Sequence, residues 1–148
     1  MSYNIGETRR VEWAYEIAKA VARCSTCRPS RQIGAIILGG WKILGIGWNG
    51  PPAGTERCGS CRKLEGGKCL AVHAEVRAIL AAGHKARGSE MFLTCEIPCV
   101  GCAGVIVESG ISTVWTPKAW FYDEAAREIF QGSRVVIREL PSGKVVSV

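Results

Sequence analysis

Two short segments limit what this chain can fold into: a His-Ala-Glu segment at residues 73–75 and a Pro-Cys-Val-Gly-Cys segment at residues 98–102. Zinc takes imidazole nitrogen and cysteine thiolate as ligands in tetrahedral sites, and a catalytic site uses three protein ligands and leaves one position for water. His73, Cys99 and Cys102 supply such a set. We therefore expect a fold that brings the two segments together around one metal ion.

Glu75 gives this ligand set a chemical purpose. A bound zinc lowers the pKa of water toward neutrality, and an unligated carboxylate beside the metal can then move the protons of that water. Cys99 and Cys102 stand at the expected start of a helix, where both side chains share one face and the helix N-terminus favours thiolates. The joint pattern favours a catalytic zinc over a redox pair or half of a structural zinc site.

Eight cysteines are a high number for a chain of 148 residues. The N-terminus lacks the order of basic, apolar and small residues that marks a signal peptide. Because the cytoplasm keeps thiols reduced, we expect a cytoplasmic protein whose cysteines bind metal rather than pair as disulfides. The apolar stretch at residues 33–48 is too short and too broken to span a membrane. The net charge of +6 favours an anionic partner.

The alternation of helical and strand patterns predicts a single α/β layered domain over residues 1–148. Apolar residues at helical spacing predict helices at Glu7–Arg23, Ala71–Ala82, Cys99–Ser109 and Phe121–Phe130. Strands are expected at Ile33–Leu38, Ile43–Trp48, Met91–Cys95, Ile111–Thr116 and Arg134–Ile137, the first two as a hairpin. Residues 51–71 form a Gly-rich and Cys-rich insert, and a loop of this length needs a reason to stay ordered.

The chain resembles the cytidine deaminase superfamily, and within it the deoxycytidylate deaminase branch. The H-x-E and P-C-x-x-C motifs carry the resemblance, which extends from about Glu12 to Trp115. The segment Gly-Trp-Asn-Gly at residues 47–50 is similar to the Gly-Tyr-Asn-Gly loop of that branch. The resemblance implies a three-layer α/β/α fold with a mixed five-stranded sheet.

The same resemblance implies a reaction and its partners. It implies the hydrolytic deamination of dCMP to dUMP by a zinc-activated water, with Glu75 moving the protons. The backbone around Ala74 and Ile97 would hold the base, and Asn49 would hydrogen-bond the sugar. Homo-oligomers are usual in the family, with neighbouring subunits completing the site. A nucleotide effector, if one regulates the chain, is expected near the Asn49 loop.

A second, structural zinc is also implied by the resemblance, because some members of the branch tie the N-terminal region to the insert in this way. We expect it to be held by four thiolates, those of Cys27, Cys58, Cys61 and Cys69. Cys24 is an alternative to Cys27. The second zinc would give residues 51–71 their reason to be ordered.

Three positions depart from the pattern of the branch: Arg77 replaces a usual Asn, Trp48 a usual Tyr, and Phe92 another usual Tyr. The Arg77 guanidinium could reach the sugar or the phosphate and would favour an anion there. Arg31, beside the expected first strand, is a further candidate for a phosphate contact. These departures leave a different or modified cytosine nucleotide, such as dCTP, as an alternative substrate.

Two other functions fit parts of the pattern. A nucleic-acid editing deaminase would flip a base out of RNA or single-stranded DNA, and the positive charge leaves this open. The Asn-Gly loop and the cysteine-rich insert favour a small nucleotide instead, so neither nucleic acid nor a membrane is the expected partner. A non-enzymatic zinc protein would need a fourth ligand and would leave Glu75 without a role.

Overall fold

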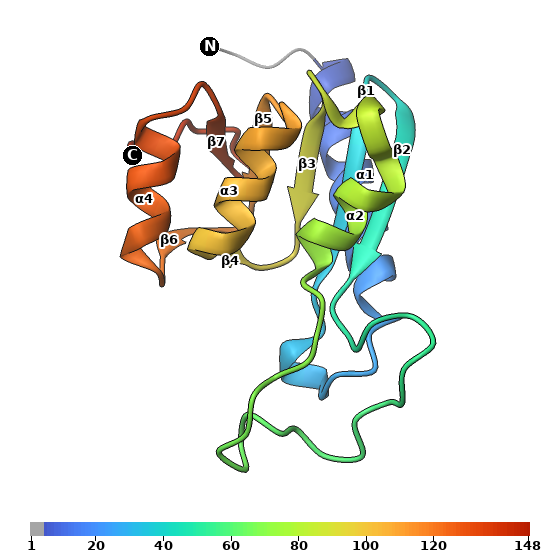
Figure 1. Ribbon diagram of the computed structural model, residues 1–148. Coiled ribbons are helices and arrows are strands. Elements are labelled where there is room, and N and C mark those ends of the chain that lie inside the picture. The colour runs from blue at the N-terminus through green and yellow to red at the C-terminus, as the bar shows by residue number, and fades with distance from the viewer. Residues whose placement is uncertain (1–4) are drawn as a thin grey trace.

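The computed structural model describes residues 5–148, and its centre is one five-stranded sheet with helices on both faces (Figure 1). The strands lie in the order β2-β1-β3-β5-β7. β1 pairs antiparallel with β2 and β3, whereas β5 pairs parallel with β3 and β7. The strand bounds are β1 Gly34–Gly39, β2 Lys42–Trp48, β3 Glu90–Leu93, β5 Thr113–Thr116 and β7 Val136–Glu139.

The helices form two outer layers. One helix covers one face of the sheet, and three helices cover the opposite face (Figure 1). The lone helix is α1 (Ile5–Ala22), and the other three are α2 (Ala74–Ala82), α3 (Val100–Ser109) and α4 (Glu124–Gln131). Two short 3-10 helices are η1 (Pro29–Arg31) and η2 (Gly83–Ala86). The expected three-layer α/β/α fold with a mixed five-stranded sheet is confirmed.

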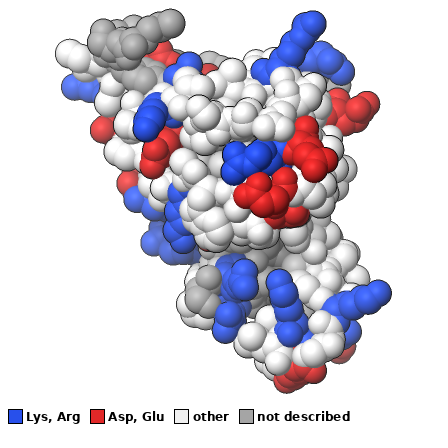
Figure 2. All heavy atoms as spheres, turned by 90° about the vertical axis from the view of Figure 1, so that its left-hand side faces the viewer, with Lys and Arg blue, Asp and Glu red and all other residues white. Residues whose placement is uncertain are grey.

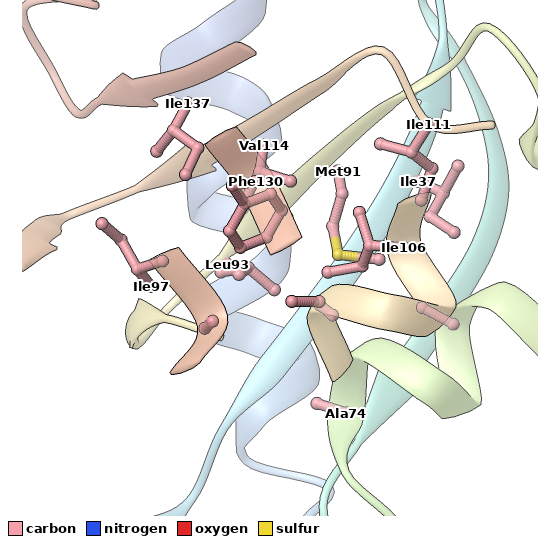
Figure 3. Packing of buried hydrophobic residues seen from close by; sticks show 14 of the residues in the cluster. Ile37, Ala74, Met91, Leu93, Ile97, Ile106, Ile111, Val114, Phe130 and Ile137 are labelled. Carbon is pink, nitrogen blue, oxygen red and sulfur yellow. The ribbon is translucent and has the colours of Figure 1, made fainter. Parts of the chain in front are cut away.

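The core consists of two apolar clusters, one on each side of the sheet. Side chains alternate along a strand, so Ile37 packs toward α2 and α3, whereas Ile36 and Leu38 pack toward α1. Figure 3 shows the larger cluster, in which Ile106 of α3 and Phe130 of α4 lie over the sheet. Burial on both faces explains why β1 is apolar along almost its whole length.

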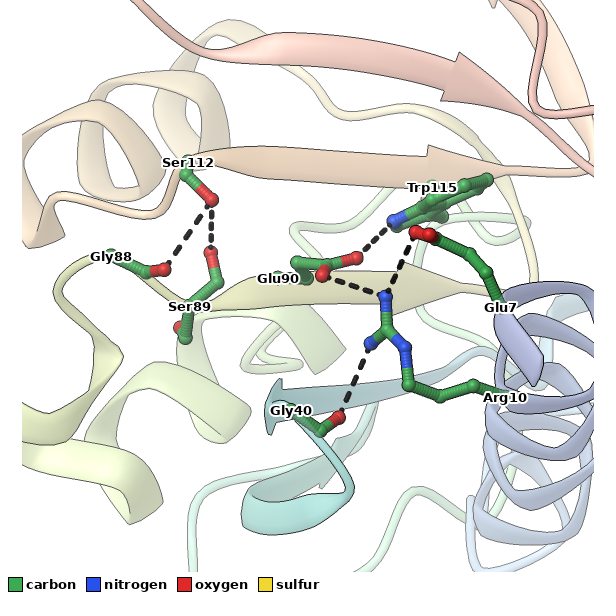
Figure 4. Close-up of polar contacts among 8 residues, drawn as sticks. All are labelled: Glu7, Arg10, Gly40, Gly88, Ser89, Glu90, Ser112 and Trp115. Carbon is green, nitrogen blue, oxygen red and sulfur yellow. Dashed lines mark hydrogen bonds and ion pairs between the residues drawn. The ribbon is translucent and has the colours of Figure 1, made fainter. Parts of the chain in front are cut away.

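The buried side chain of Arg10 connects α1 to the sheet (Figure 4). Its guanidinium donates to Glu90 Oε1 at 2.9 Å and to the Gly40 carbonyl at 3.2 Å. The other oxygen of Glu90 accepts from the Trp115 indole at 2.7 Å. A buried charge is tolerated when it is paired and hydrogen-bonded in this way, so one residue connects α1, the β1–β2 turn, β3 and β5.

Two glycines of β2 allow α2 to lie directly on the sheet. A Cβ added to Gly47 would lie 2.2 Å from the Ala74 carbonyl oxygen, and one added to Gly45 would lie 2.4 Å from the Ala78 carbonyl oxygen. Real side chains do not approach backbone atoms so closely, so only glycine fits at these two positions. The contact fixes the height of α2 above β2.

The element boundaries differ from the sequence expectations at two places that matter for the site. Helix α2 begins at Ala74 rather than Ala71, because His73 has extended backbone and serves as its N-cap. The helix expected at Phe121–Phe130 begins only at Glu124, because residues up to Phe121 form β6 (Lys118–Phe121). Strand β6 pairs with β4 (Glu96–Ile97), and neither strand was expected from the sequence.

The insert at residues 51–71 contains neither helix nor strand and projects from the end of the sheet (Figure 1). A bridge between Gly50 and Val72 closes its base. Nearly all of its side chains are exposed. Among residues 5–148, no helix has the length and hydropathy needed to cross a membrane.

Candidate metal centre and active site

The two motifs of the sequence meet at the N-terminal ends of α2 and α3. His73 is the N-cap of α2, and Cys99 is the N-cap of α3, with Cys102 in the first turn of the same helix. Both helices pack on the same face of the sheet, so the convergence follows from the fold. The structure thus brings together the three residues that were predicted as ligands of the catalytic zinc.

The ligand atoms lie close to the spacing of a tetrahedral zinc site. The Nδ1 of His73 lies 3.6 Å from the Cys99 sulfur and 3.2 Å from the Cys102 sulfur, and the three ligand atoms all lie within 4.8 Å of one another. Zinc bonds of about 2.3 Å to sulfur and about 2.0 Å to nitrogen separate such atoms by roughly 3.5 to 3.8 Å. The residues present therefore fit a zinc ion.

The electrostatics of the three groups are strongly coupled. Hydrogen bonds from Cys102 and His73 lower the pKa of the Cys99 thiol, while the bond to Cys99 and burial raise the pKa of Cys102. The bond to Cys99 also raises the pKa of His73, against the effects of burial and of the Lys63 ammonium. Cys99 thus favours the thiolate, the form of cysteine that binds a metal.

Glu75 lies beside the ligands, in the first turn of α2, and is only 4% exposed. Burial raises the pKa of its carboxyl group, and the His73 charge opposes that shift. A carboxyl group whose pKa is moved toward neutrality can both accept and release a proton in one reaction cycle. This is the property that a proton shuttle needs.

Ala74 and Ile97 are fully buried and lie at the start of α2 and in β4, respectively. Ala74 is placed between the ligand His73 and the carboxylate of Glu75, and Ile97 precedes the Pro-Cys segment. Their main chains therefore border the metal ligands, as a role in holding the base would require.

Asn49 is buried where β2 ends, and its side chain holds the segment that precedes β1. Its amide nitrogen donates to the Arg31 carbonyl, and its Oδ1 accepts from Ile33 N at 2.8 Å. Each of its polar atoms thus already has one main-chain partner. A contact with a sugar would have to use the second amide hydrogen or the second lone pair of Oδ1. The Arg31 side chain itself is exposed.

The Arg77 side chain is hydrogen-bonded to the main chain at the base of the insert. Its Nη2 donates to the carbonyl oxygens of Gly50 and Pro51, at 3.1 and 2.9 Å. Its guanidinium carbon also lies 5.2 Å from the centre of the Trp48 ring. Two of the three departures from the family pattern, Arg77 and Trp48, are therefore one contact that holds the loop after β2.

The third departure, Phe92, takes no part in the contact between Arg77 and Trp48. It is fully buried in the cluster under α1 and stacks on Trp115 with ring centres 5.4 Å apart. The metal ligands lie on the opposite face of the sheet, with α2 and α3. Phe92 therefore packs on the other side of the sheet from the metal ligands.

The cysteines of the insert are arranged differently from the ligands of the first site. Among residues 5–148, one group of three or more metal-binding side chains gathers at ligand distance, and it is His73, Cys99 and Cys102. Cys58 and Cys69 are exposed, and Cys27 and Cys61 are half-buried. The Cys27 sulfur contacts the Asn49 carbonyl at 3.9 Å, so Cys27 already lies at the base of the insert. Cys24 is exposed.

Two further residues lie at this site, Tyr122 and Asp123, and sequence reasoning missed the second. Burial and a hydrogen bond to Cys99 raise the pKa of the Tyr122 phenol, so the phenol lies close to the first cysteine ligand. The Asp123 carboxylate accepts from Val100 N, directly after that ligand, at 2.8 Å. An Asp before a helix is a recognisable N-cap signal, but starting the helix at Phe121 concealed it.

Comparisons with known proteins agree with this site. Residues 8–117 match the sequence model of the cytidine and deoxycytidylate deaminase zinc-binding region. The chain is 36% identical to the deoxycytidylate deaminase of Mycobacterium phage D29 over 121 residues, covering 72% of this chain and 93% of the relative. It is 33% identical to the human deoxycytidylate deaminase over 144 residues, covering 87% and 80%.

A solved structure gives the same result in three dimensions. The dCMP deaminase of the cyanophage S-TIM5, in complex with dCMP and dUMP, superposes with a TM-score of 0.73 at 25% identity, over 95% of this chain and 99% of that one. The fold, the ligand set and the sequence relatives thus agree. The chain belongs to the zinc-dependent cytidine and deoxycytidylate deaminase family.

Proposed function

We propose that this chain hydrolyses dCMP to dUMP and ammonia. The main support for the proposal is the group of His73, Cys99 and Cys102 at ligand distance, with a buried carboxylate, Glu75, beside it. The cyanophage enzyme with dCMP and dUMP bound supports the choice of nucleotide, because it matches almost the whole chain.

Zinc, when bound by these three residues, supplies a polarised water of lowered pKa. Glu75 would accept a proton from the attacking water as the oxygen adds to the amine-bearing carbon of cytosine. The carboxyl group would then give this proton to the neighbouring ring nitrogen and carry the second proton of the water to the amino group, which would leave as ammonia. The raised pKa of Glu75 suits both the uptake and the release.

The remaining side chains would orient the nucleotide. We place the base against the main chain at Ala74 and Ile97, and the sugar near Asn49, which the loop after β2 holds in place. The exposed Arg31 is the candidate for the phosphate, while Arg77 acts through the loop that it holds. Several Lys and Arg lie on the projection formed by η1 and the insert, with acidic residues at its tip (Figure 2), and these cations would attract an anionic substrate.

A second, structural zinc held by Cys27, Cys58, Cys61 and Cys69 is part of the proposal. Cys27 lies at the base of the insert, and the other three are carried by a segment with no helix or strand of its own. Four thiolates would close that segment into an ordered lobe. The stoichiometry is then two zinc ions per chain.

We also propose that the working enzyme is a cytoplasmic homo-oligomer. Leu80 of α2 is 74% exposed, and Val100 and Val105 of α3 are 41% and 38% exposed. Apolar side chains on neighbouring helices support burial against another subunit. A nucleotide effector would act at the Asn49 loop, which Arg77 connects to α2.

The test is to incubate the zinc-loaded protein with cytidine, dCMP, dCTP and short single-stranded DNA, and to follow conversion of cytosine to uracil. We expect turnover of dCMP, and the Glu75→Gln variant should keep its zinc and lose about 100-fold or more of its turnover. Turnover of DNA alone, or of dCTP alone, would overturn the proposed substrate. A Glu75→Gln variant as active as the parent would remove the shuttle from the mechanism.

A further inference from the structure

The helix that carries two of the metal ligands lacks the usual cap at its start. Cys99 is the N-cap of α3, but its side chain makes no capping hydrogen bond, because its sulfur faces His73 at 3.6 Å. The first amides of a helix have no partner within the helix, and an Asp, Asn, Ser or Thr at the N-cap normally supplies one. A cysteine committed to a metal cannot do so.

Asp123 supplies a partner for one of these first amides from another part of the chain. Its Oδ2 accepts from Val100 N, the first amide of α3, at 2.8 Å, while its Oδ1 accepts from Ala125 N, in the first turn of α4, at 3.2 Å. One carboxylate therefore caps two helices at once. Since Val100 follows Cys99 directly, the contact acts one peptide unit from the ligand.

The segment that carries Asp123 is itself firmly placed. Phe121, two residues earlier, is 8% exposed and packs near Phe130 of α4, with ring centres 6.4 Å apart. It also pairs with Ile97, just before the Pro-Cys segment. The carboxylate thus connects the ligand loop to a rigid part of the core rather than to a free loop.

We propose that Asp123 is a positioning residue of the metal centre: it fixes the main chain at Cys99 so that the sulfur stays directed toward His73. The inference rests on the proposed metal site. Without the carboxylate, the first turn of α3 would lose its partner, and the Cys99 sulfur would spread over several orientations. Binding would then have to order that ligand, which weakens the affinity for the metal.

The test compares zinc affinity and ligand geometry in the full chain. Asp123→Ala should weaken zinc binding at this site about 10- to 100-fold in competition with a chelator. It should also change the thiolate-to-cobalt absorption of the cobalt-substituted protein. Asp123→Asn should recover most of the affinity, because its amide oxygen can still accept from Val100 N.

The matched control is Glu124→Gln, which removes a negative charge from the next residue. Glu124 is exposed and pairs with Arg127 instead of capping α3, so zinc affinity and the cobalt spectrum should stay at their parental values. A cap that only stabilises the fold would lower Tm equally in the zinc-loaded and chelated forms. A positioning residue lowers Tm more in the zinc-loaded form.

Cys99→Ser separates this inference from the assignment of the site. If Cys99→Ser keeps parental zinc affinity, the metal site is wrong, and the role of Asp123 falls with it. If Cys99→Ser loses zinc while Asp123→Ala keeps parental affinity and an unchanged cobalt spectrum, the metal site stands and Asp123 is only a helix cap.

Discussion

Cysteines occur in two regions of this molecule that are built in opposite ways. At the metal centre, the sheet, α2 and α3 hold Cys99 and Cys102 at ligand distance from His73. In the insert, Cys58, Cys61 and Cys69 stand on a segment without helix or strand. The first site is shaped by the core, whereas a site in the second region would have to be shaped by the metal itself.

The largest expected effect comes from removing a ligand of the core-built site. His73→Ala should abolish deamination and lower the zinc content by one ion per chain, measured by elemental analysis. His84, the second histidine of the chain, is exposed on η2, so His84→Ala is the control and should retain both. If His73→Ala kept its zinc content, the core would not be what holds the metal.

A pair of glycine substitutions tests whether the core shapes the first site and not the insert. In Gly47→Ala the new methyl group would meet the Ala74 carbonyl 2.2 Å away, and α2 must move with its ligand and Glu75. We expect a loss of about 3 kcal/mol of unfolding free energy, together with most of the activity. Urea unfolding and the deamination rate measure the two.

Gly59 is the matched position in the insert, where an added Cβ meets nothing within 4 Å. Gly59→Ala should leave stability within about 0.5 kcal/mol of the parent and activity unchanged. Equal losses in the Gly47 and Gly59 variants would contradict the contrast between the two regions.

A smaller effect is expected in the insert. Cys58→Ser should lower zinc from two ions to one per chain while dCMP turnover persists, because the insert does not supply the catalytic ligands. Trypsin should then cut faster at Arg57, Arg62, Lys63 and Lys68, all of which are exposed. Gly59→Ala, a neutral change in the same segment, is the control and should keep both zinc ions. Zinc that stays at two ions in Cys58→Ser would rule out the thiolate site in the insert.

The smallest effect concerns the connection between the two regions. Arg77→Gln removes the guanidinium that contacts Gly50, Pro51 and Trp48, and should cost about 1 to 2 kcal/mol of unfolding free energy. We expect KM for dCMP to rise more than kcat falls, since the loop and not the metal is disturbed. The control is Arg57→Gln, which removes an exposed charge of the insert and should change neither the unfolding free energy nor the KM for dCMP. If Arg57→Gln changed both as much as Arg77→Gln does, the loss of a positive charge would explain the effect.

The ligands of the metal site could be predicted from sequence because their spacing is local. Cys99 and Cys102 share one turn of a helix, and Glu75 follows His73 at short range. The residue types in each motif indicate metal binding by themselves. The fold has only to bring the N-terminal ends of α2 and α3 together. The layered fold was predictable for a similar reason, since helical and strand periods alternate along the chain.

The contacts between distant segments could not be predicted in this way. Asp123 meets Val100 from a turn whose helix was expected to start earlier. The side on which Phe92 lies depends on the pairing of β3 with its neighbours. The partners of Arg77, the carbonyl oxygens of Gly50 and Pro51, lie 27 and 26 residues away along the chain. Such partners follow from tertiary packing and leave no local pattern.

The glycines beneath α2 also constrain the order in which the molecule can fold. Side chains alternate along β2, so a slip of one residue against β1 would turn Ile46 toward α2 in place of Gly45 and Gly47. Helix α2 could not then approach, and His73 could not reach the cysteines. The hairpin must therefore find its correct register before the metal site can close, and zinc binding reports on the pairing of two strands that do not touch the ion.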